Sequence, residues 1–436
     1  MTVQQDPKAA AATEEAVTPS ATIRIPIKNL KGGGDYTGQI KIGSQGVVAN
    51  VILDTGSSTL AVVPRIYQIA QDTHVGYTPY AQQVSYGTGG WSDPVIQTSL
   101  SMGSAGQEVS ITTYMAIADE QLPHNFGAAD GVLGLAFNAL NSAFDLEAYL
   151  RSERLDPPVT YPWPFPVSAS TAVLQRVAAF LDRMGQEIDL TPYFTTLEQG
   201  GVARNIFAFY TLRSVPNMAS ANPADDPLNN GIFVLGGGLE QTDLYDGEAI
   251  SVDVLDDLYY NTNLKGVQVG DGSVIEVSPL PASQAKSLVS NSIVDSGTNS
   301  LVLTSAVYGA VVSALRGLGP QFASLIDGAT SQGAAKKSSL DLANWPSITF
   351  VLQGETGADV SLTCAPNTYW QTDAPQPGLA MFQIQNGGAL PQSIFGLPLF
   401  NNYYIVFDRT QDPYGAVRFA PIAPPTAAGA TTPGAR

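Results

Sequence analysis

The sequence predicts an all-β fold with short helices, arranged as two duplicated lobes that face each other across a cleft. Composition is the first observation, because 42 Gly, 30 Pro and 18 Tyr favour many short strands and turns over long helices. Length is the second, since 436 residues exceed what one ordinary hydrophobic core serves and indicate two or three domains. The third is an internal repeat, which divides the chain into two similar halves.

The repeat begins with an Asp turn at the end of an apolar run. Residues 51–64 read VILDTGSSTLAVVP, and residues 292–304 read SIVDSGTNSLVLT. Each segment passes from apolar residues to Asp, a hydroxyl residue, Gly and a second hydroxyl residue, and then returns to apolar residues. Asp54 and Asp295 therefore occupy equivalent positions in the two halves.

A second repeated element follows each Asp turn in the same order. DGVLGLAF at 130–137 follows the first turn, and QSIFGLPLF at 392–400 follows the second. Both carry two apolar residues and then a glycine, a segment that could pack beside the Asp turn. If the two lobes face each other, Asp54 and Asp295 meet.

The small residues after each Asp suit a pair of carboxylates. Gly56 and Gly297 permit close backbone approach and offer N–H donors, while Ser57 and Thr298 can hydrogen-bond the carboxylates. Two carboxylates held about 3 Å apart cannot both ionise cheaply and so share a proton. One then serves as a base and the other as an acid.

These features together resemble the pepsin-like aspartic proteases, including bacterial homologues without a prosegment or disulfides. The resemblance rests on the paired Asp turns, the two apolar-apolar-Gly segments and YGTG at 86–89, and it extends over most of residues 23–421. Similar stretches are YTGQIKIGS at 36–44, GIFVLGGGLEQ at 231–241 and FNNYYIVFDR at 400–409. A lone Asp-x-Gly is ordinary turn chemistry, but several independent features agree here.

The resemblance implies the fold and the activity of an aspartic endopeptidase. The fold would be bilobal, with two barrel-like β lobes and the active site between them. Asp54 and Asp295 would activate a water molecule that attacks a peptide carbonyl without a covalent intermediate, with an acidic pH optimum. Thr55 and Ser296 would tie the two Asp turns together. The residues that support the dyad would be Thr55, Gly56, Ser57, Ser296, Gly297 and Thr298.

The resemblance also implies how substrate is held. Residues Tyr86, Gly87 and Thr88 would form the tip of a β-hairpin flap that closes over the peptide and excludes water. Apolar residues that flank the motifs would line the pockets and favour apolar residues on either side of the cut bond. These pocket residues are Ile52, Val132 and Ile293.

Three features depart from the family's usual pattern. Ala61 stands where a Trp commonly bonds the flap tyrosine, and Trp91 is a possible replacement. The second motif reads DSG, which keeps the hydroxyl. Residues 138–190 form an expansion, in which Val173, Val177, Phe180, Leu181 and Met184 recur at helical spacing. An amphipathic helix on the first lobe is favoured, and a lid or a partner surface is the alternative.

We expect five segments along the chain. They are a disordered lead at 1–20, an N-terminal lobe at 21–212 with the insertion at about 138–190, a connector at 213–230, a C-terminal lobe at 231–423 and a disordered tail at 424–436.

The resemblance implies polypeptide substrates as partners, and charge and composition argue against other classes of partner. A net charge of −18 disfavours nucleic acid and anionic membranes, and no stretch is apolar enough to span a bilayer. One cysteine and two histidines make a metal site improbable, so we expect no metal or other cofactor. We expect a monomer.

Localisation follows from the first residues and from cysteine content. The lead has no basic start with an apolar run, Lys8 is its one base, and a single cysteine permits no intrachain disulfide. We therefore expect an enzyme that is competent as translated in a reducing compartment, most simply the cytoplasm of a bacterium. Secretion by another route stays open.

Two other function classes stay open at this point. One is a catalytically weak protease-like fold used as a binding or inhibitory module, and the weaker one is a two-carboxylate glycosidase. Binding of a pepstatin-type transition-state mimic distinguishes the protease from both.

Overall fold

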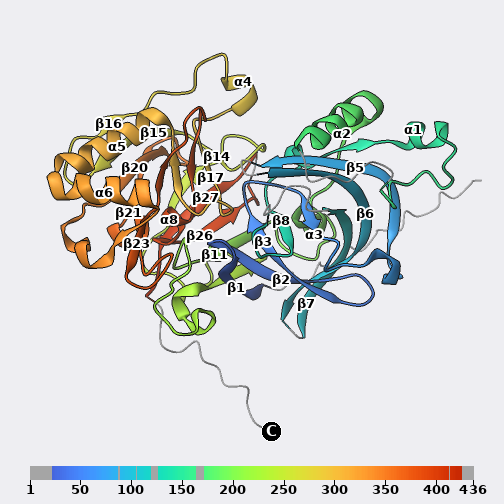
Figure 1. Cartoon of the computed structure of the whole chain (residues 1–436), viewed down its shortest axis with the longest axis horizontal. Helices are drawn as coiled ribbons and strands as arrows, with labels where there is room; N and C mark the ends of the chain where they lie inside the picture. The colour runs from blue at the N-terminus through green and yellow to red at the C-terminus, as the bar shows by residue number, and fades with distance from the viewer. Residues whose placement is uncertain are drawn as a thin grey trace, which may run out of the picture.

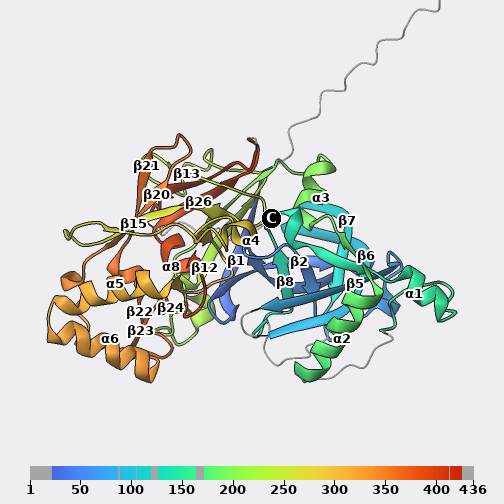
Figure 2. The ribbon, with the colours of Figure 1, turned by 90° about the horizontal axis from the view of Figure 1, so that it is seen from above.

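The computed structural model describes residues 22–86, 89–104, 106–118, 126–163, 171–411 and 413–424. The side chains of residues 85, 86, 89 and 171–174 lie outside this description. Strands dominate, helices are few and short, and the N-terminal and C-terminal halves form two lobes side by side (Figures 1 and 2). The predicted all-β, bilobal fold with short helices is therefore confirmed.

The N-terminal lobe is built largely from one curved sheet. Its strands are β1 (Ile23–Gly32), β2 (Asp35–Ile42), β3 (Val47–Asp54), β4 (Leu60–Val62), β5 (Gly76–Tyr86), β6 (Gly89–Ser104), β7 (Gln107–Ile117), β8 (Gly131–Gly134), β9 (Ser142–Asp145) and β10 (Gln186–Asp189). The alternation of IRIPIKN places Ile23, Ile25 and Ile27 inside, because successive strand residues point to opposite faces.

The two lobes share one continuous sheet. After β1 it continues through β12 (Asn230–Leu235), β11 (Ile206–Tyr210), β26 (Tyr403–Asp408), β27 (Ala416–Pro421) and β13 (Ile250–Asp253). β1 and β26, from near the two ends of the chain, thus lie in the same sheet with β12 and β11 between them, so backbone hydrogen bonds join the two lobes.

Three smaller sheets and most of the helices complete the C-terminal lobe. The strands are β14 (Asn261–Thr262), β15 (Leu264–Val269), β16 (Ile275–Glu276), β17 (Ser292–Val294), β18 (Leu301–Leu303), β19 (Ala335–Lys336), β20 (Ile348–Gln353), β21 (Asp359–Cys364), β22 (Trp370–Thr372), β23 (Leu379–Phe382), β24 (Ile384–Asn386) and β25 (Ser393–Phe395). The helices of this lobe are α4 (Ala285–Leu288), α5 (Ser305–Gly317), α6 (Pro320–Gln332), α7 (Pro366–Tyr369) and α8 (Leu397–Phe400).

The sequence repeat is also a repeat of topology. β3 pairs in parallel with β8, and β17 pairs in parallel with β25, so each Asp strand lies beside its apolar-apolar-Gly segment. Glycine is required there, because a Cβ on Gly134 would lie 2.4 Å from the carbonyl carbon of Ser58, and one on Gly396 would lie 2.2 Å from the carbonyl oxygen of Thr298.

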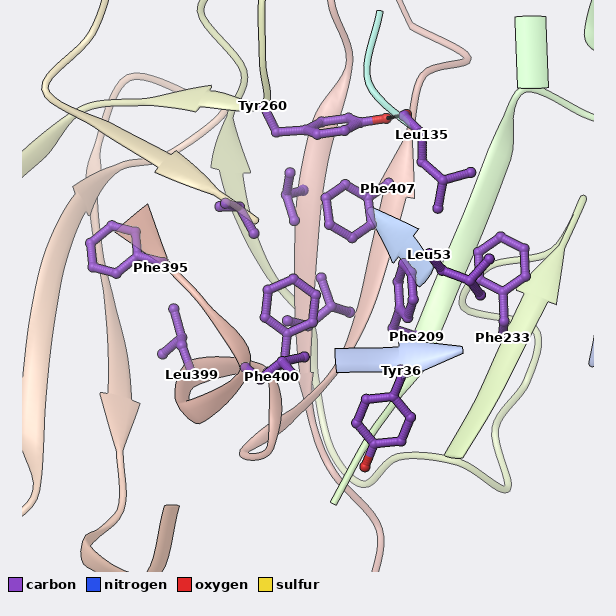
Figure 3. Packing of buried hydrophobic residues seen from close by; sticks show 14 of the residues in the cluster. Tyr36, Leu53, Leu135, Phe209, Phe233, Tyr260, Phe395, Leu399, Phe400 and Phe407 are labelled. Atoms are coloured by element: carbon purple, nitrogen blue, oxygen red, sulfur yellow. Dashed lines mark hydrogen bonds between the residues drawn. The ribbon is translucent and has the colours of Figure 1, made fainter. Parts of the chain in front are cut away.

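Aromatic side chains fill the core beneath the junction of the lobes (Figure 3). The rings of Tyr260 and Phe407 pack with centroids 4.5 Å apart, and Phe209 and Phe233 with centroids 5.1 Å apart. The Tyr260 hydroxyl donates a 2.7 Å hydrogen bond to the Leu135 carbonyl of the first lobe. Because the buried Tyr260 hydroxyl bonds to the other lobe, it orients the ring that packs in the apolar core.

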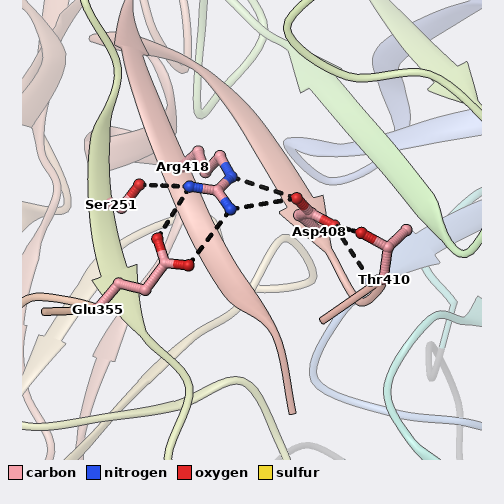
Figure 4. Close-up of polar contacts among 5 residues, drawn as sticks. All are labelled: Ser251, Glu355, Asp408, Thr410 and Arg418. Atoms are coloured by element: carbon pink, nitrogen blue, oxygen red, sulfur yellow. Dashed lines mark hydrogen bonds and ion pairs between the residues drawn. The ribbon is translucent and has the colours of Figure 1, made fainter. Parts of the chain in front are cut away.

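A polar network stabilises the far edge of the shared sheet (Figure 4). Arg418 of β27 lies 3.2 Å from Asp408 of β26 and 2.9 Å from Glu355, and it donates to Ser251 of β13 at 2.7 Å. The guanidinium group, which has five donors in a fixed plane, thus connects two neighbouring strands to a turn.

The expansion predicted at about 138–190 contains α1 (Glu147–Ser152) and α2 (Thr171–Met184), and α3 (Tyr193–Gln199) follows it. Val177 and Leu181 of α2 are buried together with Ala81 of β5, so the helix packs on the N-terminal lobe. Phe180 is partly buried and Met184 is exposed, whereas the side chain of Val173 lies outside the described residues. No helix among the described residues is long and apolar enough to cross a membrane.

Candidate active site

Asp54 and Asp295 are held by equivalent hydrogen bonds. Oδ1 of each accepts from the backbone N–H two residues on, at 2.8 Å from Gly56 and 2.8 Å from Gly297. Oδ2 of each accepts from a hydroxyl three residues on, at 2.5 Å from Ser57 and 2.6 Å from Thr298. Each carboxylate is thus oriented by its own turn.

Each carboxylate also lies against the backbone of the opposite turn. A Cβ built on Gly56 would lie 2.7 Å from Cγ of Asp295, and one built on Gly297 would lie 2.3 Å from Oδ1 of Asp54. Both distances are shorter than non-bonded atoms tolerate. The two glycines therefore permit the approach of the acids.

Thr55 and Ser296 join the two turns. The Thr55 N–H donates to Ser296 Oγ at 3.0 Å, and the Ser296 N–H donates to Thr55 Oγ1 at 2.8 Å. Their hydroxyls donate in turn to the carbonyls of Val294, at 3.2 Å, and Leu53, at 2.7 Å. Because both residues are buried, the four bonds hold the dyad within a narrow geometry.

The environment of the dyad favours retention of a proton. Asp54 and Asp295 are 9% and 8% exposed. Burial, and after it the charge of Asp295, raises the pKa of Asp54, against the lowering effect of its bonds from Ser57 and Gly56. Two buried carboxyl groups in this arrangement can hold one proton between them and act as an acid and base pair.

The dyad opens into a cleft of about 810 Å³. Asp54 and Asp295 lie among its lining residues together with Ile52, Val132 and Ile293, the three apolar residues for which the sequence predicts a role in the pockets. Phe126, Tyr259 and Leu288 add to the apolar wall.

Asp35, the first residue of β2, is a third carboxyl group in the cleft that the sequence interpretation missed. Its Oδ1 is shielded from solvent and has no hydrogen-bond partner among the described residues. Burial, followed by the charges of Asp295 and Asp54, raises the pKa of Asp35. Its position directly before the YTGQIKIGS stretch was the one available signal.

The predicted flap coincides with the hairpin of β5 and β6, in which Tyr86 pairs with Gly89. Gly87 and Thr88 lie outside the described residues, as does the side chain of Tyr86. Ala61 and Trp91 belong to one buried cluster. The Trp91 Nε1 has no hydrogen-bond partner among the described residues.

The described part of the chain offers no group of three or more His, Cys, Asp or Glu side chains arranged to hold a metal ion. The site itself offers carboxyl groups, hydroxyls and backbone N–H donors.

Several known proteins are similar to this chain in sequence. Gastricsin of Cavia porcellus is 24% identical over 398 residues, which cover 87% of this chain and 79% of that protein. Pepsin-2B of Gadus morhua is 24% identical over 406 residues, covering 89% and 96%. Cathepsin D of Dictyostelium discoideum is 31% identical over 135 residues, which are 28% of this chain and 35% of that protein.

The family comparison covers most of the chain. A model of the family described as "Eukaryotic aspartyl protease" matches residues 35–150 and 179–421, which include both Asp turns and both apolar-apolar-Gly segments. The gap between the matched ranges falls within the expansion that the sequence predicts at about 138–190. The chain belongs to the pepsin-like aspartyl protease family.

Proposed function

We propose that this protein is an aspartic endopeptidase that hydrolyses peptide bonds within polypeptides. The observation that carries the proposal is the pair of buried carboxyl groups, each bonded by its own Gly N–H and hydroxyl and each lying against the other's turn. Packing alone does not explain this arrangement, because burial of two acids side by side costs stability. Such a cost is typical of a working site.

The mechanism uses one proton shared by the dyad. The ionised carboxylate takes a proton from a water molecule as its oxygen attacks the peptide carbonyl, and the protonated carboxyl group hydrogen-bonds the carbonyl oxygen. The resulting tetrahedral species collapses when the amide nitrogen receives a proton and the C–N bond breaks. Water is consumed, an acid and an amine leave, and the dyad regains its single proton.

Activity should fall as pH rises and the dyad loses its shared proton, because the mechanism needs one carboxyl group of the pair protonated. The raised pKa of Asp54 supports retention of that proton above the usual range of a carboxyl group. Ile52, Val132 and Ile293 favour apolar residues on either side of the cut bond, since burial of an apolar side chain adds binding energy.

The test is cleavage of an internally quenched peptide library at pH 3 to 7 by the wild type and by Asp54→Asn and Asp295→Asn. Asp271→Asn, in an exposed turn, is the matched control. We expect both dyad variants to lose nearly all turnover, and the control to keep it. A dyad variant that cleaves at close to the wild-type rate would overturn the proposal, as would a wild type that neither cleaves nor binds a pepstatin-type mimic.

A further inference from the structure

The C-terminal lobe carries a second apolar hollow beside the cleft. This groove has a volume of about 400 Å³ and lies between the segment that follows β16, the first turns of α5 and the loop after β24. Residues that define it include Ile275, Pro279, Leu280, Ala306, Val307 and Leu390. α5 packs against β15 (Figure 1). The buried side chains of Val267 in β15 and Val307 in α5 line the groove, so its floor belongs to the core of the lobe.

Large apolar side chains are exposed at this groove. Ile275 is 36% exposed and Leu390 is 49% exposed, and the neighbouring Val274 is 50% exposed. They are three of the eight large apolar side chains exposed among the described residues. An exposed apolar patch of this kind costs free energy in water and marks a surface that binds something.

The groove adjoins the cleft. Leu390 and Pro391 line both hollows, so the loop that carries them forms a low wall between the dyad and the groove. A polypeptide that leaves the cleft over this loop arrives at the groove. An extended chain advances about 3.3 Å per residue, so a few residues beyond the cut bond suffice.

Hydrogen bonds hold the loop after β24 in place without a ligand. Ser305, at the start of α5, donates to the Gly388 carbonyl at 2.8 Å and to Asn386 Oδ1 at 2.9 Å. The Gly387 N–H donates to the Leu303 carbonyl at 2.8 Å. The wall is therefore formed before anything binds, which lowers the entropic cost of binding.

The charge of the lining residues indicates which kind of ligand the groove binds. Glu276 is the one charged residue among the described residues that line the groove, so the groove suits an apolar segment. The chain's own residues 425–436, PTAAGATTPGAR, contain no large apolar side chain to fill it. A polypeptide substrate that already occupies the cleft is thus the ligand best placed to reach it.

We propose that this groove is an extension of the substrate site, which binds a large apolar residue of the polypeptide several positions from the cut bond. The inference rests on the proposed endopeptidase function. It adds a recognition rule, because substrates would be selected by an apolar residue outside the cleft as well as by the residues at the cut bond.

The experiment compares short and long substrates. A short quenched peptide of about six residues spans about 20 Å and fills the cleft alone. Long versions carry several more residues on one side or the other, with either Leu or Gln at each added position in turn. We expect Leu at one or two of these positions to raise kcat/KM about tenfold over Gln, since burial of one Leu side chain is worth at least that factor.

Two charged variants on the same helix locate the effect. Ala306→Arg places a guanidinium in the groove, whereas Ser313→Arg places one on an exposed part of α5 that does not line it. Ala306→Arg should abolish the preference for Leu and leave the short peptide's kinetics unchanged. Ser313→Arg should change neither.

The outcomes separate this inference from the proposed function. If the short peptide is cleaved but Leu and Gln versions are equal, or if Ala306→Arg slows short and long peptides alike, the extended site is wrong while the peptidase stands. If Ala306→Arg alters only the oligomeric state, the groove binds another copy of the chain and the inference is also wrong. If no peptide is cleaved, the proposed function itself fails.

Discussion

Thr55 and Ser296 exchange hydrogen bonds across the junction of the lobes, each N–H donating to the other's side-chain oxygen at 3.0 and 2.8 Å. The exchange couples the two Asp turns, because each bonded residue directly follows its Asp. Displacement of one turn would therefore strain the other. The rigidity of the dyad is thus a property of the lobe interface and not of either lobe alone.

Thr55→Val tests this coupling. Valine keeps the shape of threonine but leaves the Ser296 N–H and the Val294 carbonyl without partners in a buried site. We expect a loss of about 1–3 kcal/mol in the free energy of unfolding and a clear fall in kcat. Thr55→Ser keeps the hydroxyl and should retain most of both. Chemical denaturation and peptide turnover measure the two effects, and equal behaviour of the Val and Ser variants would contradict the coupling.

Asp35 predicts a stability that depends on pH. Because its pKa is raised in the folded protein, the folded state binds its proton more tightly than the unfolded state does. The stability that this proton provides is present below the ordinary carboxyl pKa of about 4, and it declines as pH rises towards the raised value. Asp35→Asn removes the titrating group and keeps its shape.

The measurement compares melting temperatures of Asp35→Asn and the wild type from pH 4 to pH 7. We expect the two proteins to be similar at pH 4 and the variant to become the more stable one as pH rises. A difference that is constant across this range would show that Asp35 has an ordinary pKa.

Trp91 is the candidate partner for the flap that Ala61 leaves without one. Its buried indole N–H has no partner among the described residues, and it lies on β6 opposite Val84, close to the end of the hairpin. Trp91→Phe removes the donor and keeps an aromatic ring. If the indole N–H bonds the flap when substrate is bound, the variant loses that hydrogen bond. A loss of about 1 kcal/mol corresponds to a roughly fivefold rise in KM.

Trp370→Phe is the control for this prediction. Trp370 is equally buried in the C-terminal lobe, and its Nε1 also has no partner in the described part of the chain. The control should leave KM unchanged. If both variants raise KM to the same degree, the effect of Trp91 comes from packing and not from the flap.

Local repetition explains how much of the site the sequence predicted. The contacts of Asp54 with Gly56 and Ser57 lie within three residues, so a short motif contains the whole carboxylate geometry. The duplication also predicted that the two acids lie beside each other. Residues whose role depends on a single motif were therefore predictable.

The features that the sequence did not predict depend on contacts between residues far apart in the chain. Asp35 is an ordinary acid at the start of a strand, and only the fold brings it near Asp54 and Asp295. The sheet shared by both lobes depends in the same way on pairing of β11 with β26, strands some 200 residues apart, which no local pattern reveals.

Gly297→Ala tests the closeness of the dyad with the smallest possible change. The added methyl group would lie 2.3 Å from Oδ1 of Asp54, so either the carboxylate or the turn has to move. We expect kcat to fall at least a hundredfold, because misplacement of a catalytic group by about 1 Å costs that much. KM should change far less, since the apolar pockets are untouched.

Gly309→Ala is the matched control for that substitution. Gly309 lies in α5, and apart from its chain neighbours and the helix's own backbone no atom lies within 4 Å of an added Cβ. Alanine there should stabilise the helix by about 1 kcal/mol and leave turnover intact. Denaturation curves distinguish a displaced dyad from a damaged fold. A Gly297→Ala enzyme with normal kcat would mean that the two carboxyl groups are farther apart than the structure places them, and that the shared proton is not the basis of catalysis.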